Sequence, residues 1–265
     1  MRAWSRAGHR SRADDQHQSE RVESVVLTPS PFDQDETAPR LLVSVRDADE
    51  ALAAALAGAD LVDAKDPARG ALGALPVATV RALVARVAGR AVTSAVAGEP
   101  ADAAALAPHV AAMAATGVDY VKVAVRAEFS DAALTEAAAA APGRLIAVLF
   151  AGHDPAPGLV ARLAAAGFVG AMIDTATKDG RRLLDLLPAR TLAAFTRACR
   201  RHGLVSGLAG SLALADIERL ASLGAHYLGF RGGLCRDSDR TKGLDPARVA
   251  EAVRSLRAHA RRDAA

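Results

Sequence analysis

From residue 41 onward, short apolar runs alternate with longer Ala-rich segments in which apolar and polar positions follow helical spacing. Between the runs, segments such as DADEALAAALAGA and LADIERLASLGA carry their apolar residues on one helical face. The pattern predicts eight repeats of a strand followed by a helix. The strands are expected at residues 41–45, 60–66, 91–98, 120–125, 144–152, 170–180, 204–211 and 226–233.

The number and size of these repeats favour one fold within the α/β class. Eight units over about 225 residues, or roughly 28 residues per unit, match a (β/α)8 TIM barrel. An open doubly wound sheet is the alternative, but it would carry a Gly-rich turn after its first strand, where this chain reads Arg46-Asp47-Ala48. We therefore expect residues 41–265 to form a single barrel domain.

Glycine marks the expected ends of several helices. A glycine at such an end adopts the left-handed conformation and caps the helix. The positions are Gly58, Gly117, Gly167, Gly203 and Gly224.

The first 40 residues differ from the rest of the chain. They are polar, mix both charge signs and are interrupted by Pro31 and Pro39. They lack the apolar segment of a secretory signal. Residues 1–40 are predicted to be a disordered N-terminal extension.

Composition excludes several classes of partner. With 3% aromatic residues and a net charge of +3, the chain has no concentrated basic face with aromatic platforms for nucleic acid. No apolar run reaches the ~20 residues of a membrane helix. Cys199 and Cys235 are too few for a disulfide framework or a structural zinc site, and the histidines show no metal-ligand spacing. We expect a cytoplasmic protein with reduced thiols and without a metal or cofactor; the sequence leaves the oligomeric state open, including a homo-oligomer.

Lysine is scarce, which gives its positions weight. The chain has 29 arginines but only four lysines, Lys65, Lys122, Lys178 and Lys242. The first three are separated by 57 and 56 residues, or two repeats each, so they fall on or just after expected strands 2, 4 and 6. Side chains from alternate strands share the interior layers of a barrel, and barrel active sites lie at the carboxyl ends of the strands. We expect three amines to converge there. Lys242, in the polar stretch CRDSDRTKG, is interpreted as a solvated residue of a mobile loop.

Strand alternation indicates which polar side chains face the barrel interior. Lys122 has the opposite phase to its valine neighbours, which suit the helix layer. Asp63 and Lys65 are two residues apart and share a face. Asp174 takes the inward phase of its strand, and Lys178 follows in the loop.

A cluster of amines suits covalent chemistry on a carbonyl. Burial and neighbouring ammonium groups lower the pKa of the most buried lysine, and a free amine can form an imine that acts as an electron sink. Arginine stays protonated and cannot do this. On sequence grounds Asp63 and Asp174 either neutralise the buried lysines or transfer protons themselves.

The loops after strands 7 and 8 predict an anion site. They read LAGS and FRGG, and these two loops form the phosphate site in many barrels. Small residues free backbone N–H groups, a serine adds a hydroxyl and an arginine adds a bidentate contact. The expected phosphate-binding residues are Gly210, Ser211, Arg231, Gly232 and Gly233.

Several of these segments resemble one family. LLVSVRDADEALAAALAGADLVDAKDPARGALGA, YVKVAV, AMIDTATKDGRRLLDLL, LAGSL and RGGLCRDSDRTKG are together similar to (5-formylfuran-3-yl)methyl phosphate synthase, a lysine-dependent barrel of methanofuran biosynthesis. The resemblance covers about residues 41–255, and DAKDPxxGALGA and DTATKDG are its most specific motifs.

The resemblance implies a reaction and a role for each polar residue. Two molecules of glyceraldehyde 3-phosphate, a triose phosphate, would condense to a furan with loss of water and phosphate, as in a carbon–oxygen lyase acting on phosphates. It further implies that Lys65 forms the Schiff base and that Lys122 transfers protons. Asp63, Asp174 and Lys178 match the other polar groups of that site.

Other functions remain open at this point. They are another Schiff-base aldolase, an Asp-x-Lys decarboxylase acting on a sugar phosphate, and a non-catalytic phosphate-sensing barrel.

Overall fold

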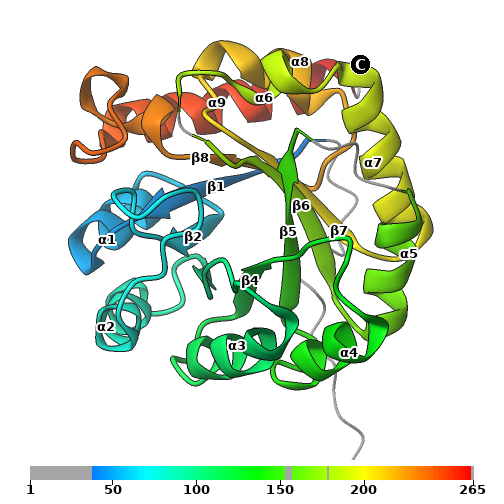
Figure 1. The fold of residues 1–265 in the computed structure, drawn as a ribbon. Coiled ribbons are helices and arrows are strands. Elements are labelled where there is room, and N and C mark those ends of the chain that lie inside the picture. Colours follow the sequence, from blue (N-terminus) through cyan, green and yellow to red (C-terminus); the bar gives the residue numbers. More distant parts are fainter. Residues whose placement is uncertain (1–37, 153–156, 178, 264–265) are drawn as a thin grey trace, which may run out of the picture. The chain divides into compact units, whose positions relative to one another are not determined.

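The computed structural model describes residues 38–152, 157–177 and 179–263 (Figure 1). The strands form one closed parallel barrel in the order of the sequence, which confirms the predicted fold. The predicted runs were right in number but overran the strand ends. The strands are β1 Arg40–Val45, β2 Leu61–Ala64, β3 Val92–Val96, β4 Tyr120–Ala124, β5 Leu145–Ala151, β6 Gly170–Thr175, β7 Val205–Ala209 and β8 Tyr227–Phe230.

The helices lie outside the ring of strands (Figure 1). The α-helices are α1 Ala48–Leu56, α2 Val77–Val87, α3 Leu106–Ala114, α4 Asp131–Ala139, α5 Pro157–Ala166, α6 Leu183–Leu186, α7 Ala189–Arg201, α8 Ile217–Ala221 and α9 Pro246–Asp263. Short 3₁₀ turns are η1 Ala103–Ala105, η2 Leu214–Asp216, η3 Gly232–Leu234 and η4 Arg236–Ser238. The segment LADIERLASLGA forms less α-helix than its pattern predicts, because its first turn is the 3₁₀ turn η2.

Local signals explain where helices begin and end. The Asp47 and Ser130 side chains accept the backbone N–H of Glu50 and Ala133, which caps the starts of α1 and α4. All five glycines expected at helix ends have positive φ, which confirms that prediction.

The strands have two differently filled faces. Outward residues such as Val121 and Val123 pack with the helices in one apolar cluster. The inner face carries apolar side chains at one end and charged ones at the other. Tyr227 fills part of the interior beside Gly207, where an added Cβ would lie 2.3 Å from the tyrosine ring, so glycine is needed at that position.

The first strand begins inside the segment that was predicted to be disordered. Strand β1 begins at Arg40, the last residue of the predicted extension. Residues 1–37 lie outside the described part, so their disorder stays a prediction. Among the described helices, none combines the length and apolar character needed to cross a membrane.

Candidate active site

A cavity of about 310 Å³ opens where the strands end and their following loops begin. Its lining includes Asp63 of β2, Lys122 of β4 and Asp174 of β6, together with Lys65 just after β2. The structure therefore brings four of the five predicted polar residues together around one cavity. The fifth, Lys178, lies outside the described residues.

The deeper ion pair joins Lys122 and Asp63. The Lys122 Nζ lies 2.7 Å from Asp63 Oδ1, and both side chains are almost fully buried. Burial lowers the pKa of Lys122 from its ordinary 10.5; the Asp63 charge opposes that shift and the nearby Lys65 charge adds to it. Lys122 is therefore easier to deprotonate than an ordinary solvent-exposed lysine.

Two serines complete the surroundings of Asp63. The Ser94 hydroxyl donates to Asp63 Oδ1 at 2.7 Å, and the Ser44 hydroxyl donates to Oδ2 at 3.3 Å. Ser44, Asp63 and Ser94 are register partners on β1, β2 and β3, so barrel closure itself aligns them. The Lys122 amine and the two serine hydroxyls therefore give the Asp63 side chain three hydrogen-bond donors.

The second ion pair lies nearer the opening of the cavity. The Lys65 Nζ lies 3.2 Å from Asp174 Oδ2, and Asp174 Oδ1 accepts the Thr175 backbone N–H at 2.7 Å. Lys65 is 8% exposed and Lys122 only 2%. Lys65 is therefore the more accessible of the two amines.

The serine partners were missed by the sequence-based prediction. Ser44 and Ser94 are single hydroxyls within apolar strands, with no motif around them. Their inward phase, shared with Asp63 across neighbouring strands, is the signal that identifies them once the register is known.

The loop after β7 has an unusual backbone. Gly210 has φ +123°, and a Cβ there would lie 2.6 Å from Thr175 Cγ2, so the position requires glycine. Ser211 follows at φ +51°, a conformation that non-glycine residues rarely adopt and that often marks a functional turn. In the described residues no protein acceptor receives the backbone N–H of Ser211, Gly232 or Gly233, and all three residues line the cavity.

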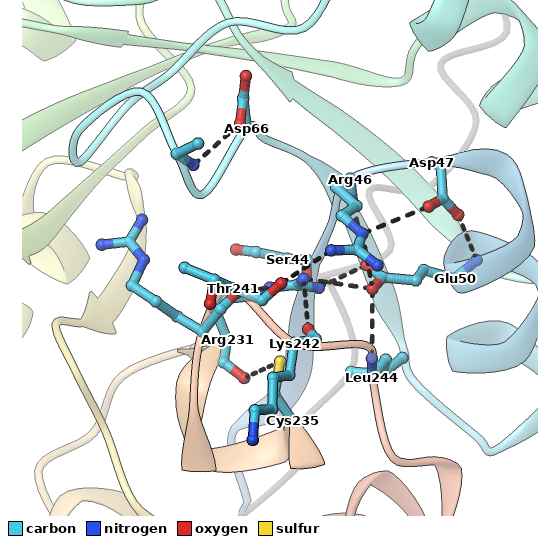
Figure 2. Close-up of polar contacts among 12 residues, drawn as sticks. Ser44, Arg46, Asp47, Glu50, Asp66, Arg231, Cys235, Thr241, Lys242 and Leu244 are labelled. Atoms are coloured by element: carbon cyan, nitrogen blue, oxygen red, sulfur yellow. Dashed lines mark hydrogen bonds and ion pairs between the residues drawn. The ribbon is translucent and has the colours of Figure 1, made fainter. Parts of the chain in front are cut away.

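Arg231 departs from its predicted role. Its guanidinium donates to both carboxylate oxygens of Glu50 and to the backbone oxygens of Ser44, Arg240 and Lys242 (Figure 2). An arginine has five N–H donors, and these acceptors take all five. The sequence suggested a bidentate phosphate contact from Arg231; the structure instead uses this side chain to fix the loop after β8.

The described residues contain two thiols and no cluster of metal-ligating side chains. Cys199 and Cys235 are both free and buried. No group of three or more His, Cys, Asp or Glu side chains in these ranges is placed to hold a metal ion.

Comparison with known proteins identifies the family. The profile described as 4-HFC-P synthase matches residues 41–253. The chain belongs to the 4-HFC-P synthase family. A (5-formylfuran-3-yl)methyl phosphate synthase of Methanopyrus kandleri is 36% identical over 77% of this chain and 93% of its own length. A Methylorubrum extorquens protein provisionally given the same name is 65% identical over 86% of this chain and 95% of its own.

Solved structures support the fold of this family member. Phosphoribosyl anthranilate isomerase of Thermus thermophilus matches with a TM-score of 0.60 at 14% identity, over 83% of this chain and 98% of its own. The 3-hexulose-6-phosphate synthase of Salmonella typhimurium matches with a TM-score of 0.60 at 16% identity, over 83% of this chain and 99% of its own. At such identities the likeness concerns the barrel alone.

Proposed function

We propose that the chain condenses two molecules of glyceraldehyde 3-phosphate to (5-formylfuran-3-yl)methyl phosphate through an imine at Lys65, in the biosynthesis of a methanofuran-type cofactor. The observation that carries the proposal is the pairing of two lysines with two aspartates around one cavity, in a chain of the 4-HFC-P synthase family. The overall change balances when two triose phosphates give one furan phosphate, one inorganic phosphate and two water molecules.

Lys65 is the proposed nucleophile because it is the more accessible amine. Its Nζ attacks the carbonyl carbon of one substrate, a C=N bond forms, and the carbonyl oxygen leaves as water. The resulting iminium withdraws electrons from the adjacent carbon, which makes a proton there removable. Asp174 holds the Lys65 ammonium in place before the reaction and is near enough to receive a proton.

Lys122 is the proposed base of the later steps. Its lowered pKa increases the fraction of neutral amine near neutral pH, which suits proton transfer. Asp63 positions this amine and is itself held by the two serines. Lys178, outside the described residues, is proposed as a further proton-transferring group of the same site.

The proposed phosphate site lies in the loops after β7 and β8. The support is the set of backbone N–H groups without acceptors at Ser211, Gly232 and Gly233, next to the positive-φ turn at Gly210. Successive N–H groups of such turns form concave anion sites.

Borohydride trapping tests the imine. The protein is incubated with glyceraldehyde 3-phosphate and sodium borohydride, then digested and analysed by mass spectrometry. The expected result is a reduced triose adduct on Lys65, and its absence in Lys65→Arg. An adduct on another lysine, or none, overturns the assignment. Product analysis separates the furan from the open-chain aldol that a simple aldolase would release, and from the CO₂ of a decarboxylase.

A further inference from the structure

The cations that line the cavity differ in one respect. Four of them have a carboxylate partner within 4 Å. The pairs are Lys65–Asp174, Lys122–Asp63, Arg182–Asp216 and Arg231–Glu50. Arg240 also lines the cavity, and no described carboxylate lies within that distance of its guanidinium. Arg240 is therefore the cavity cation whose charge the described protein leaves unpaired.

Arg240 also has hydrogen-bonding capacity to spare. One Nη donates to the Gly70 backbone oxygen at 3.0 Å, across the opening from the loop after β8 to the loop after β2. Its Nε is buried and has no hydrogen-bond partner. A buried donor without an acceptor is unfavourable, so its presence calls for a reason such as a ligand. Arg231, on the same loop, has no N–H left.

The loop holds Arg240 beside the glycine backbone of the proposed phosphate site. A Cβ added to Gly232 would lie 3.6 Å from Arg240 Cβ and 3.7 Å from Arg240 N. The Arg240 carbonyl accepts from Arg231 Nε. The buried ion pair between Arg231 and Glu50, both labelled in Figure 2, anchors that contact to helix α1. Partial burial lowers the pKa of Arg240, with Asp174 opposing the shift and Arg231 adding to it; a phosphate would offset both burial and repulsion.

We propose that Arg240 binds a phosphate group of the substrate and so selects phosphorylated over unphosphorylated aldehydes, with Arg231 and Glu50 as positioning residues for its loop. The proposal rests on the proposed function for the identity of the aldehyde. A guanidinium contacts phosphate through two parallel N–H groups, which the free Nε–H and Nη–H of Arg240 supply.

The test compares Arg240→Gln and Arg240→Lys with the control Arg81→Gln. Arg81, on α2, is exposed, does not line the cavity and also donates to one backbone oxygen, that of Ala115. Two measurements are made: binding of inorganic phosphate by calorimetry, and the rate of borohydride trapping at Lys65 with glyceraldehyde 3-phosphate and with glyceraldehyde. Circular dichroism checks the fold of each variant.

Arg240→Gln is expected to weaken phosphate binding by roughly 10- to 100-fold and to lower trapping with glyceraldehyde 3-phosphate at subsaturating concentration by a similar factor. Trapping with glyceraldehyde should not change. Arg240→Lys should recover part of the loss, because charge remains while the planar fork is gone. Arg81→Gln should behave as the parent.

Each alternative outcome is decisive. An Arg240→Gln protein that binds phosphate and distinguishes the two aldehydes as the parent does overturns the proposal. Equal losses with both aldehydes assign Arg240 a general role in holding the loop and also overturn it. If the parent shows no Lys65 adduct with either aldehyde, the proposed function fails, while the phosphate-binding result still decides the role of Arg240.

Discussion

The two lysine–aspartate pairs of the cavity use the same chemical groups in different surroundings. The Lys122 Nζ lies 2.7 Å from Asp63 Oδ1, and the Asp63 side chain also accepts hydrogen bonds from two serine hydroxyls. The Lys65 Nζ lies 3.2 Å from Asp174 Oδ2 nearer the opening, and Asp174 also accepts the Thr175 backbone N–H. The deeper pair is the more buried of the two, and the lysine of the outer pair is the more exposed.

This difference suggests a division of work between the amines. An amine that forms a covalent bond must reach the substrate, and an amine that shuttles protons benefits from a lowered pKa in a fixed position. Accessibility therefore favours Lys65 for the imine, and burial favours Lys122 for proton transfer.

The largest effect is expected from Lys65→Arg. The charge next to Asp174 persists, so the fold should be kept, but a guanidinium cannot form an imine. Turnover should fall by roughly 10⁴-fold or more, as it does when covalent nucleophiles are removed. Steady-state kinetics and a thermal melt check this. A variant with substantial turnover would mean that another amine is the nucleophile.

A smaller loss is expected from Lys122→Ala and from Asp174→Asn. Each should lower turnover by roughly 10²-fold or more, as removal of acid–base groups does. Because Lys122→Ala leaves Asp63 buried without its cation, loss of folding must be separated from loss of chemistry. The double variant Lys122→Met/Asp63→Leu removes both charges; it should fold, give the Lys65 adduct with borohydride and remain inactive.

The pH profile of turnover should report Lys122. The base is the neutral amine, whose fraction rises with pH through its pKa. Because burial lowers this pKa from 10.5, the rate should rise with pH and level off below that value. The same rising limb should be missing from the residual activity of Lys122→Ala. A limb that persists in this variant would assign the titration to another group.

The sequence was sufficient to predict where most of these charged side chains lie in the barrel. Strand alternation placed Lys122 and Asp63 on the inner face, and the repeat length placed Lys65 two units from Lys122, because both follow from backbone periodicity. The helix ends were equally predictable, since glycine there meets a local conformational need. Features that depend only on neighbouring residues in the chain could therefore be predicted from the sequence.

The hydrogen-bond partners of the arginines could not be predicted from the sequence. Arg231 and Glu50 are 181 residues apart, and no local pattern shows that one arginine is fully used by the protein while Arg240 keeps free donors. The same holds for the serines at Asp63, which come together only through strand register. Such contacts depend on three-dimensional geometry rather than residue type.

The two serines offer a finer test of how the deeper pair is held. Ser94→Ala removes the 2.7 Å donor to Asp63, and Ser44→Ala removes the 3.3 Å donor. Loss of a well-formed hydrogen bond to a buried charge should lower the free energy of unfolding by about 1–3 kcal/mol, and loss of the longer one by less. Urea denaturation measures both, and an equal or larger loss in Ser44→Ala would contradict the ranking.

The smallest effect is expected at a third lysine–aspartate pair, which isolates the influence of burial. Lys242 Nζ lies 2.7 Å from Asp237 Oδ2, the same separation as in the Lys122–Asp63 pair, but the Lys242 side chain is 50% exposed. Water and salt screen an exposed pair, so Lys242→Ala should change the free energy of unfolding by no more than about 1 kcal/mol. Turnover should stay within about twofold, because Arg231 contacts the Lys242 backbone oxygen, which the substitution leaves in place. A Lys242→Ala variant as damaged as Lys122→Ala would show that distance between the charges, rather than their burial beside the cavity, determines their importance.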